Sequence, residues 1–161
     1  MRNLLVVSAV LTLACSRPAT AGMTITSSSF AAGKPIPAQF TCDGANTPPP
    51  LAVHGVPPKA KSLALIVTDP DAPGGTFTHW VLWNVAPAPT SLSGGTAGTN
   101  DFGKVGYGAP CPPKGTHRYV FTLYALDTML NLPASAKRGD VERAMRGHVV
   151  AQTSLTGRYQ R

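Results

Sequence analysis

The sequence predicts a single, mainly β domain, and three observations support this prediction. The chain has 161 residues, of which 43% are hydrophobic and 13% charged, enough for one domain with a sizeable core. Its 16 prolines and 16 glycines imply many turns and little helix. Apolar runs that begin at Leu63, His79 and Tyr119 alternate with a period of two, which is the spacing of half-buried strands.

The first 21 residues predict an export signal. Arg2 supplies a positive start, and residues 4–14 form an apolar stretch that is too short to span a bilayer. Ala19-Thr20-Ala21 has the small-residue pattern that a signal peptidase cleaves. We therefore expect a mature domain of residues 22–161, in the periplasm or secreted.

Two alternatives to cleavage after Ala21 remain open. In the first, the segment ending at Cys15 is a lipobox and the protein is a lipoprotein anchored at this cysteine, although Thr12 and Leu13 fit that motif poorly. In the second, Met23 is the true first residue of a cytoplasmic protein.

The charge of the chain favours no nucleic-acid partner. The formal net charge is +7 at pH 7, and removal of the leader lowers it to +5 because Arg2 and Arg17 leave with it. The remaining basic residues are scattered without a dense run, so we expect no binding to nucleic acid. The same charge permits peripheral contact with an anionic membrane surface.

Cleavage of the leader leaves two cysteines, Cys42 and Cys111, in loops rich in glycine and proline. In an oxidising compartment this even pair predicts one disulfide, whereas in the cytosol the two would be unrelated thiols. A bridge would close a loop of about 70 residues and stabilise the fold by about 4 kcal/mol on the chain-entropy model.

The central motif runs from Leu63 to Asn84, where two apolar runs flank a loop that Pro70 and Pro73 stiffen. The first run ends on Asp69, and alternation places this carboxylate on the face of Leu63, Leu65 and Val67. Alternation in the second run groups four side chains on one face: His79, Val81, Trp83 and Val85. If the runs pair antiparallel, Asp69 lies beside His79.

A third element is expected to reach the same end of the sheet as Asp69 and His79, which we call the rim. The loop 106–116 precedes His117, Arg118 and Tyr119, which open an apolar run that ends at Leu126. Tyr119 shares a face with the apolar side chains, so it could meet Asp69 and His79 at one edge of a sheet. Arg118 has the opposite parity, so we expect it to form a buried, bidentate ion pair with an acidic residue of the loop at 69–71. His117 fits either a pocket wall or a structural imidazole.

These motifs resemble the two signature regions of the phosphatidylethanolamine-binding protein family, in particular its bacterial Raf kinase inhibitor-like branch. The resemblance rests on six stretches: FTCDG at 40–44, DPDAP at 69–73, HW at 79–80, DFG at 101–103, GTHRY at 115–119 and GRYQR at 157–161. It implies an antiparallel β-sandwich with few helices and a small pocket for phosphate-type anions, such as a phospholipid headgroup or a phosphorylated ligand. The family name also implies modulation of a partner protein, as an inhibitor-like factor for a kinase or protease.

The candidate ligand-binding residues are side chains and loop positions at the rim: Asp69, His79, Gly108, Cys111, His117 and Tyr119. An anion pocket needs N–H and O–H donors shielded from water, and His79 and Tyr119 carry such groups. The backbone N–H groups of Gly108, Ala109 and Cys111 could form an anion-binding nest. Because a carboxylate repels an anion, we expect Asp69 either to orient and charge His79 or to share a proton with the ligand. We prefer the first role.

Four further residues are expected to support the site: Pro70, Asp71, Pro73 and Arg118. A metal-dependent or acid/base hydrolase built on Asp69, Asp71, His79 and His117 is the alternative function. These ligand types suit a metal, but their spacing is not diagnostic. The chain has no G-x-S-x-G, C-x-x-C or H-E-x-x-H motif, so we expect a binding protein without a cofactor, monomeric or dimeric.

One short helix is predicted near the C-terminus. Asp140 is placed to cap it, and apolar or half-polar residues recur at helical spacing: Val141, Ala144, Met145, His148 and Val149. Residues 149–159 predict a closing strand.

Overall fold

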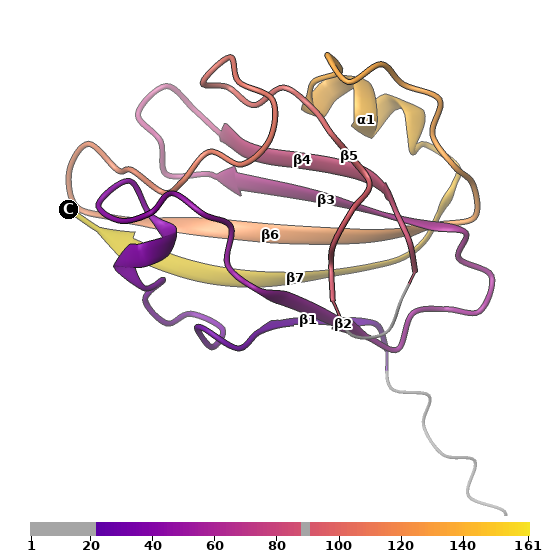
Figure 1. The fold of residues 1–161 in the computed structure, drawn as a ribbon, viewed down its shortest axis with the longest axis horizontal. Helices are drawn as coiled ribbons and strands as arrows, with labels where there is room; N and C mark the ends of the chain where they lie inside the picture. Colours follow the sequence, from indigo (N-terminus) through magenta and orange to yellow (C-terminus); the bar gives the residue numbers. More distant parts are fainter. Residues whose placement is uncertain (1–21, 88–90) are drawn as a thin grey trace, which may run out of the picture.

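Two antiparallel sheets make up the computed structural model, which describes residues 22–87 and 91–161 (Figure 1). The smaller sheet pairs β1 (Thr24–Ser27) with β2 (Leu51–His54). The larger sheet has the strand order β5-β4-β3-β6-β7. Its strands, in chain order, are β3 (Ser62–Asp69), β4 (Phe77–Val85), β5 (Thr96–Ala97), β6 (Thr116–Leu126) and β7 (Val149–Gln160). The predicted mainly β, antiparallel fold is confirmed.

The predicted leader, residues 1–21, lies outside the described residues, and so do Cys15 and the cleavage site after Ala21. In the part that is described, a single turn of 3-10 helix, η1 (Ala38–Phe40), precedes β2, and α1 (Arg138–Ala144) precedes β7. Neither helix is long and apolar enough to cross a membrane.

The two faces of the large sheet pack against different partners. One face packs against the small sheet in a cluster that includes Val53, Leu65 and Phe121. The other face packs against α1 through Val141, which joins Trp83 in a second cluster. The side chains of residues 63–67 are buried throughout, because apolar layers cover both faces of β3.

Helix α1 differs from its prediction at both ends. Lys137 is the N-cap, so Asp140 lies in the first turn rather than at the cap. Its carboxylate still accepts a hydrogen bond from the backbone N–H of Lys137, at 3.0 Å. His148 and Val149 lie beyond the helix, since Gly147, at φ +81°, adopts the left-handed conformation that ends helices. The predicted closing strand is β7.

Two β-bulges in β4 break the alternation of its side chains. Near Asn84, which has φ +56°, and again at His79, β4 contains one residue more than the paired segment of β3. Val81 and Trp83 therefore lie in the cluster beneath α1, whereas Val85 lies in the cluster beneath the small sheet. The predicted common face of these residues with His79 is wrong, because strict alternation ends at each bulge.

Candidate functional site

The candidate pocket lies at the end of the large sheet where β3 ends and where β4 and β6 begin (Figure 1). Its volume is about 150 Å³, and its walls come from three separate stretches of chain: Asp69, Ala72, Pro73, Phe77, His79, Phe102, Cys111, Pro113 and His117. Four of the six predicted ligand-binding residues line it. Gly108 and Tyr119 lie next to the walls without lining the cavity, and Pro70 lies in the turn that follows β3.

The bulge at His79 places this imidazole in the pocket. In the β3–β4 register Asp69 pairs with Phe77, so the predicted pairing with His79 is wrong. Because His79 is the extra residue, its ring turns to the same face as its neighbour Trp80, and its centroid is 5.1 Å from that of Tyr119. Without the bulge His79 would lie on the face that packs against α1.

Asp69 is paired with His117. The Oδ2 atom of Asp69 is 2.7 Å from Nδ1 of His117, and Oδ1 accepts the backbone N–H of Asp71 at 2.8 Å. The expectation that Asp69 orients His79 is therefore wrong, because both carboxylate oxygens have other partners. The pairing explains how a carboxylate can line an anion pocket. Two protein donors form hydrogen bonds with its oxygens and offset its negative charge.

His79 is oriented by a backbone carbonyl. Its Nδ1 is 2.8 Å from the oxygen of Gly108, and since a carbonyl can only accept, Nδ1 carries the proton. Burial lowers the pKa of His79 below its ordinary value of 6.5, while the Gly108 carbonyl and the charge of Asp69 act in the opposite direction. In the neutral ring Nε2 is an acceptor, not a donor.

The predicted nest of backbone N–H groups is largely occupied. The N–H of Gly108 donates to the carbonyl of His79 at 2.8 Å, and the N–H of Ala109 donates to Oδ1 of Asn46 at 3.0 Å. The predicted disulfide between Cys42 and Cys111 is present, with Cα atoms 5.4 Å apart. These contacts attach the loop to β4 and to the segment after η1, so it serves as a pocket wall.

Tyr119 lies behind the wall, with its ring edge-to-face against the ring of His79. Burial raises the pKa of Tyr119, and the charge of Asp69 adds to this shift, so the hydroxyl keeps its proton at neutral pH. The hydroxyl group is buried, and its proton has no acceptor among the described residues. Such an unsatisfied donor beside a pocket is a candidate contact for a ligand.

Arg118 and Asp71 form the predicted bidentate pair outside the pocket. Nε and Nη2 of Arg118 lie 2.9 and 2.7 Å from the two oxygens of Asp71, and the backbone N–H of Arg118 donates as well. The hydrogen bonds from the Arg118 side chain and backbone lower the pKa of Asp71 to about 2. The expected burial of this pair is wrong, since the Arg118 side chain is 53% exposed.

Two aromatic walls were not singled out from the sequence as site residues. Phe77 and Phe102 pack with their ring centroids 4.7 Å apart, and Phe102 is 5.4 Å from the ring of His79. The DFG motif at 101–103 was the available signal for Phe102. Together the two rings form the wall of the cavity next to His79.

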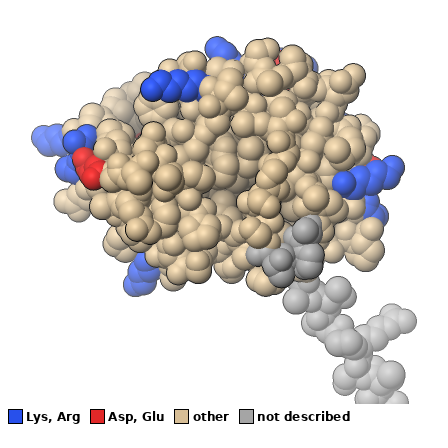
Figure 2. Space-filling model, in the orientation of Figure 1, with Lys and Arg blue, Asp and Glu red and all other residues tan. Residues whose placement is uncertain are grey.

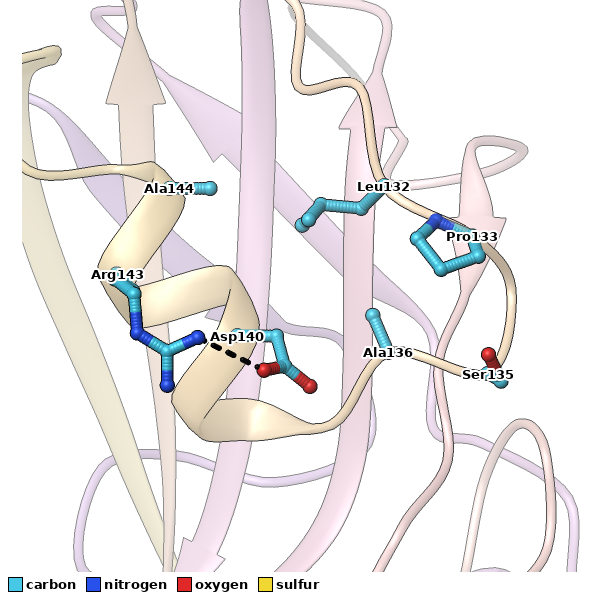
Figure 3. Close-up of a pocket in the computed structure, with 7 residues that line it drawn as sticks. All are labelled: Leu132, Pro133, Ser135, Ala136, Asp140, Arg143 and Ala144. Carbon is cyan, nitrogen blue, oxygen red and sulfur yellow. Dashed lines mark hydrogen bonds and ion pairs between the residues drawn. The ribbon is translucent and has the colours of Figure 1, made fainter.

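A larger hollow, of about 420 Å³, lies at the other end of the sheet beside α1 (Figure 3). Its walls are apolar groups of Leu132, Pro133 and Ala136 and the ion pair of Arg143 with Asp140, Nη1 to Oδ1, at 3.1 Å. Both side chains of that pair are exposed to solvent, and each neutralises the charge of the other. The rim pocket, with two buried imidazoles, is therefore the candidate site.

The described residues contain no group of three or more His, Cys, Asp and Glu side chains placed to hold a metal ion. Asp71, one member of the metal set considered from the sequence, is bound to Arg118 and does not line the pocket.

The fold and the pocket define a class: a small antiparallel β domain with a compact, partly polar pocket at one end of its large sheet. The chain belongs to the phosphatidylethanolamine-binding protein family, whose model matches residues 26–160. The UPF0098 protein of Methanothermobacter thermautotrophicus is 50% identical over 137 residues, which cover 78% of this chain and 91% of that protein. The UPF0098 protein of Pyrococcus abyssi is 43% identical over 171 residues, which cover 98% and 96%.

Solved structures agree with this assignment. A phosphatidylethanolamine-binding protein homologue from Chlamydia trachomatis superimposes with a TM-score of 0.83 at 38% identity, covering 87% of this chain and 98% of that one. YbcL of E. coli, a member of the same family, superimposes with a TM-score of 0.80 at 31% identity, covering 88% and 99%. Membership confirms the resemblance and implies a protein that binds anionic or phosphate-bearing groups.

Proposed function

We propose that the rim pocket binds a small phosphate-type anion, either a phospholipid headgroup or a phosphorylated ligand, and that the protein is an exported binding protein and not an enzyme. The observation that carries this proposal is the pair of buried imidazoles, His79 and His117, whose Nδ1 atoms are engaged by the protein. In each ring Nε2 is the nitrogen left for a ligand.

The binding mechanism follows from the two tautomers. With Asp69 ionised, Nδ1 of His117 donates to it, as Nδ1 of His79 donates to Gly108. While both rings are neutral, each offers an acceptor at Nε2, so an anion then binds only together with a proton. Either an imidazole takes up that proton, or the ligand brings it as a P–OH group.

Sulfate and phosphate separate these two routes. Sulfate carries no proton near neutral pH, so it needs an imidazolium, and its affinity should rise as the pH falls. Monoanionic phosphate can donate its own proton to Nε2, so its affinity should depend less steeply on pH. The buried hydroxyl of Tyr119 offers one further donor, so Tyr119→Phe should weaken binding by about 1 kcal/mol.

Calorimetric titration between about pH 5 and 8, a window around the free histidine pKa, tests the proposal. His79→Gln and His117→Gln should each weaken sulfate and phosphate binding, and the exposed His148→Gln is the matched control. A His79→Gln variant that stays folded and binds both anions like the wild type at every pH would contradict the proposal.

A hydrolase built on Asp69, Asp71, His79 and His117 needs the Asp71 carboxylate in the pocket, and its bond to Arg118 argues against that role. Turnover of simple phosphate esters, abolished by Asp71→Asn, would favour the hydrolase. Modulation of a partner protein remains a proposal that rests on the family alone.

Export is supported by the disulfide, since such crosslinks persist in oxidising compartments. Expressed with its own leader, the protein should be recovered from the periplasm or the medium with Gly22 as its first residue. N-terminal sequencing decides this, and a start at Met23 or a lipid on Cys15 would contradict it.

A further inference from the structure

The rim pocket is polar at its inner end and apolar at its mouth. Its three ionisable walls are between 3% and 6% exposed: Asp69, His79 and His117. The walls that are exposed to solvent are apolar: Pro73, Phe102 and Pro113. Buried walls mark the inner end of a cavity and exposed walls mark its opening, so a ligand passes apolar groups to reach the two imidazoles.

The phosphate of a ligand leaves little room beside it in the cavity. Under the proposed function it lies at the inner end, against the Nε2 atoms of His79 and His117, because both Nδ1 atoms are bound to the protein. The cavity volume of about 150 Å³ is equivalent to about five water molecules in the liquid. Each phosphate oxygen is about as large as a water molecule, so a group attached to the phosphate must lie at the mouth.

The mouth offers no partner for a charged or hydroxylated group. Its exposed side chains have neither donors nor acceptors, and no lysine or arginine lines the cavity. Figure 2 shows basic side chains around an acidic one at the left end of the view, where the chain terminates in Figure 1, but these cations are not among the walls. A polar group at the mouth would lose water without gaining a hydrogen bond from these side chains, whereas an apolar group would bury area against them.

The protein itself holds Phe102 at the mouth, although this residue is 47% exposed. The Oδ1 atom of the buried Asn100 accepts the backbone N–H groups of Phe102 and Lys104, at 3.0 and 3.1 Å. The ring lies against Gly108, where a Cβ atom would be 2.6 Å from Cδ2 of Phe102. A wall that is already in place loses little conformational entropy when a ligand packs against it.

We propose that the mouth of the rim pocket selects phosphate esters whose attached group is apolar, alkyl or aryl phosphates, over esters with a hydroxylated or charged group, and that Phe102 is the specificity-determining residue. This inference rests on the proposed function, because the phosphate of the same ligand occupies the inner end. The selection comes from apolar contact, so it should persist as the salt concentration rises, unlike a selection by exposed charges.

Calorimetric titration of the mature protein tests the inference with inorganic phosphate, glycerol 3-phosphate, propyl phosphate and phenyl phosphate. Glycerol 3-phosphate and propyl phosphate have the same charge and the same carbon chain, and they differ only in hydroxyl groups. We expect propyl phosphate to bind more tightly than glycerol 3-phosphate. Phenyl phosphate should bind about tenfold more tightly than glycerol 3-phosphate, because a contact between two aromatic rings adds to the effect of the buried area.

Variants of the loop at 100–106 locate the source of this preference. Phe102→Ala should remove most of it, and Phe102→Leu, which keeps an apolar side chain, should retain part of it. Val105→Ala is the matched control, because Val105 lies in the same loop, is 61% exposed and does not line the cavity. The preference is a ratio of affinities within one variant, so a general loss of stability or of phosphate affinity does not produce the same result.

The outcomes separate the inference from the proposed function. If inorganic phosphate binds and phenyl phosphate has no advantage over glycerol 3-phosphate, the apolar selection is wrong and the pocket stands. If the advantage persists in Phe102→Ala, or disappears equally in Val105→Ala, Phe102 is not its source and the inference is also wrong. If no probe binds, both proposals fail.

Sedimentation with vesicles that contain phosphatidic acid, a phosphate ester of an apolar diacylglycerol, identifies the source of the ligand. Binding to these vesicles that soluble phenyl phosphate displaces would indicate a lipid. Binding of phenyl phosphate without binding to the vesicles would indicate a free alkyl or aryl phosphate. Both results support the apolar selection at the mouth.

Discussion

Each end of the large sheet carries a hydrogen-bonded His–Asp pair, and the two pairs differ in burial. At the pocket end Asp69 lies 2.7 Å from His117, and their side chains are 5% and 8% exposed. At the other end Asp127 lies 2.9 Å from His148, and these side chains are 45% and 47% exposed. Water screens the exposed pair and solvates either side chain if its partner is removed. In the buried pair, water cannot replace a removed partner. The same residue types therefore form a candidate site at one end and a surface contact at the other.

The two ends are also stabilised by different means. The helix end rests on apolar packing of Val141 and Met145 beneath α1. The pocket end has the disulfide of Cys42 with Cys111 and hydrogen-bonded loops. The disulfide and these hydrogen bonds hold the loop of the pocket wall in place.

The largest expected effect comes from removal of the crosslink. Cys42→Ser with Cys111→Ser should lower the free energy of unfolding by about 4 kcal/mol, because the bridge closes a loop of about 70 residues in the unfolded chain. Thermal and denaturant unfolding measure the loss. Hydrogen exchange should accelerate at Gly108 and Ala109 before it does in α1, and equal acceleration at both ends would contradict the contrast between them.

The next effect separates the two His–Asp pairs directly. Asp69→Ala should cost about 3 kcal/mol, because it leaves the buried His117 and the N–H of Asp71 without their acceptor. Asp127→Ala should cost less than about 1 kcal/mol, as exposed pairs do. Denaturant titration of both variants gives the comparison, and similar losses would show that burial does not distinguish the pairs.

A smaller effect appears in the pH dependence of stability. Because the folded pKa of His79 is below 6.5, the unfolded chain takes up this proton first as the pH falls. The free energy of unfolding should therefore decrease below pH 6.5, until the pH reaches the folded pKa and the loss is complete. His79→Gln should flatten this part of the profile, and His148→Gln should not. Added sulfate should reduce the loss by stabilising the imidazolium.

The smallest effect on stability is expected at the exposed Arg118–Asp71 pair. In Arg118→Gln the pKa of Asp71 should rise from about 2 toward 3.8, because the hydrogen bonds from the guanidinium are lost. The pair contributes stability above pH 3.8, and the contribution disappears as the pH falls through 2. NMR titration of the Asp71 carboxyl measures the shift, with Arg143→Gln and Asp140 as the matched pair at the helix end.

Local sequence was sufficient for those features that depend on strand parity. The period of two placed Tyr119 with Phe121 on the core face of β6 and Arg118 on the other, so the bidentate pair with Asp71 followed. The even cysteine count predicted the bridge, and the motifs predicted the family and the end of the sheet at which the pocket lies.

Tertiary structure alone decided which polar groups meet inside the pocket. A bulge adds one residue at His79 and turns it to the core face, and the sequence around it has no signal that separates a bulge from a regular strand. Asp69 reaches His117 and not His79, and the nest at Gly108 and Ala109 is occupied by a carbonyl of β4 and by the side chain of Asn46. These partners come from distant parts of the chain, and a buried donor takes whichever acceptor the packing brings within 3 Å. The sequence therefore determines which chemical group each residue carries, whereas the register of the whole sheet determines its hydrogen-bond partner.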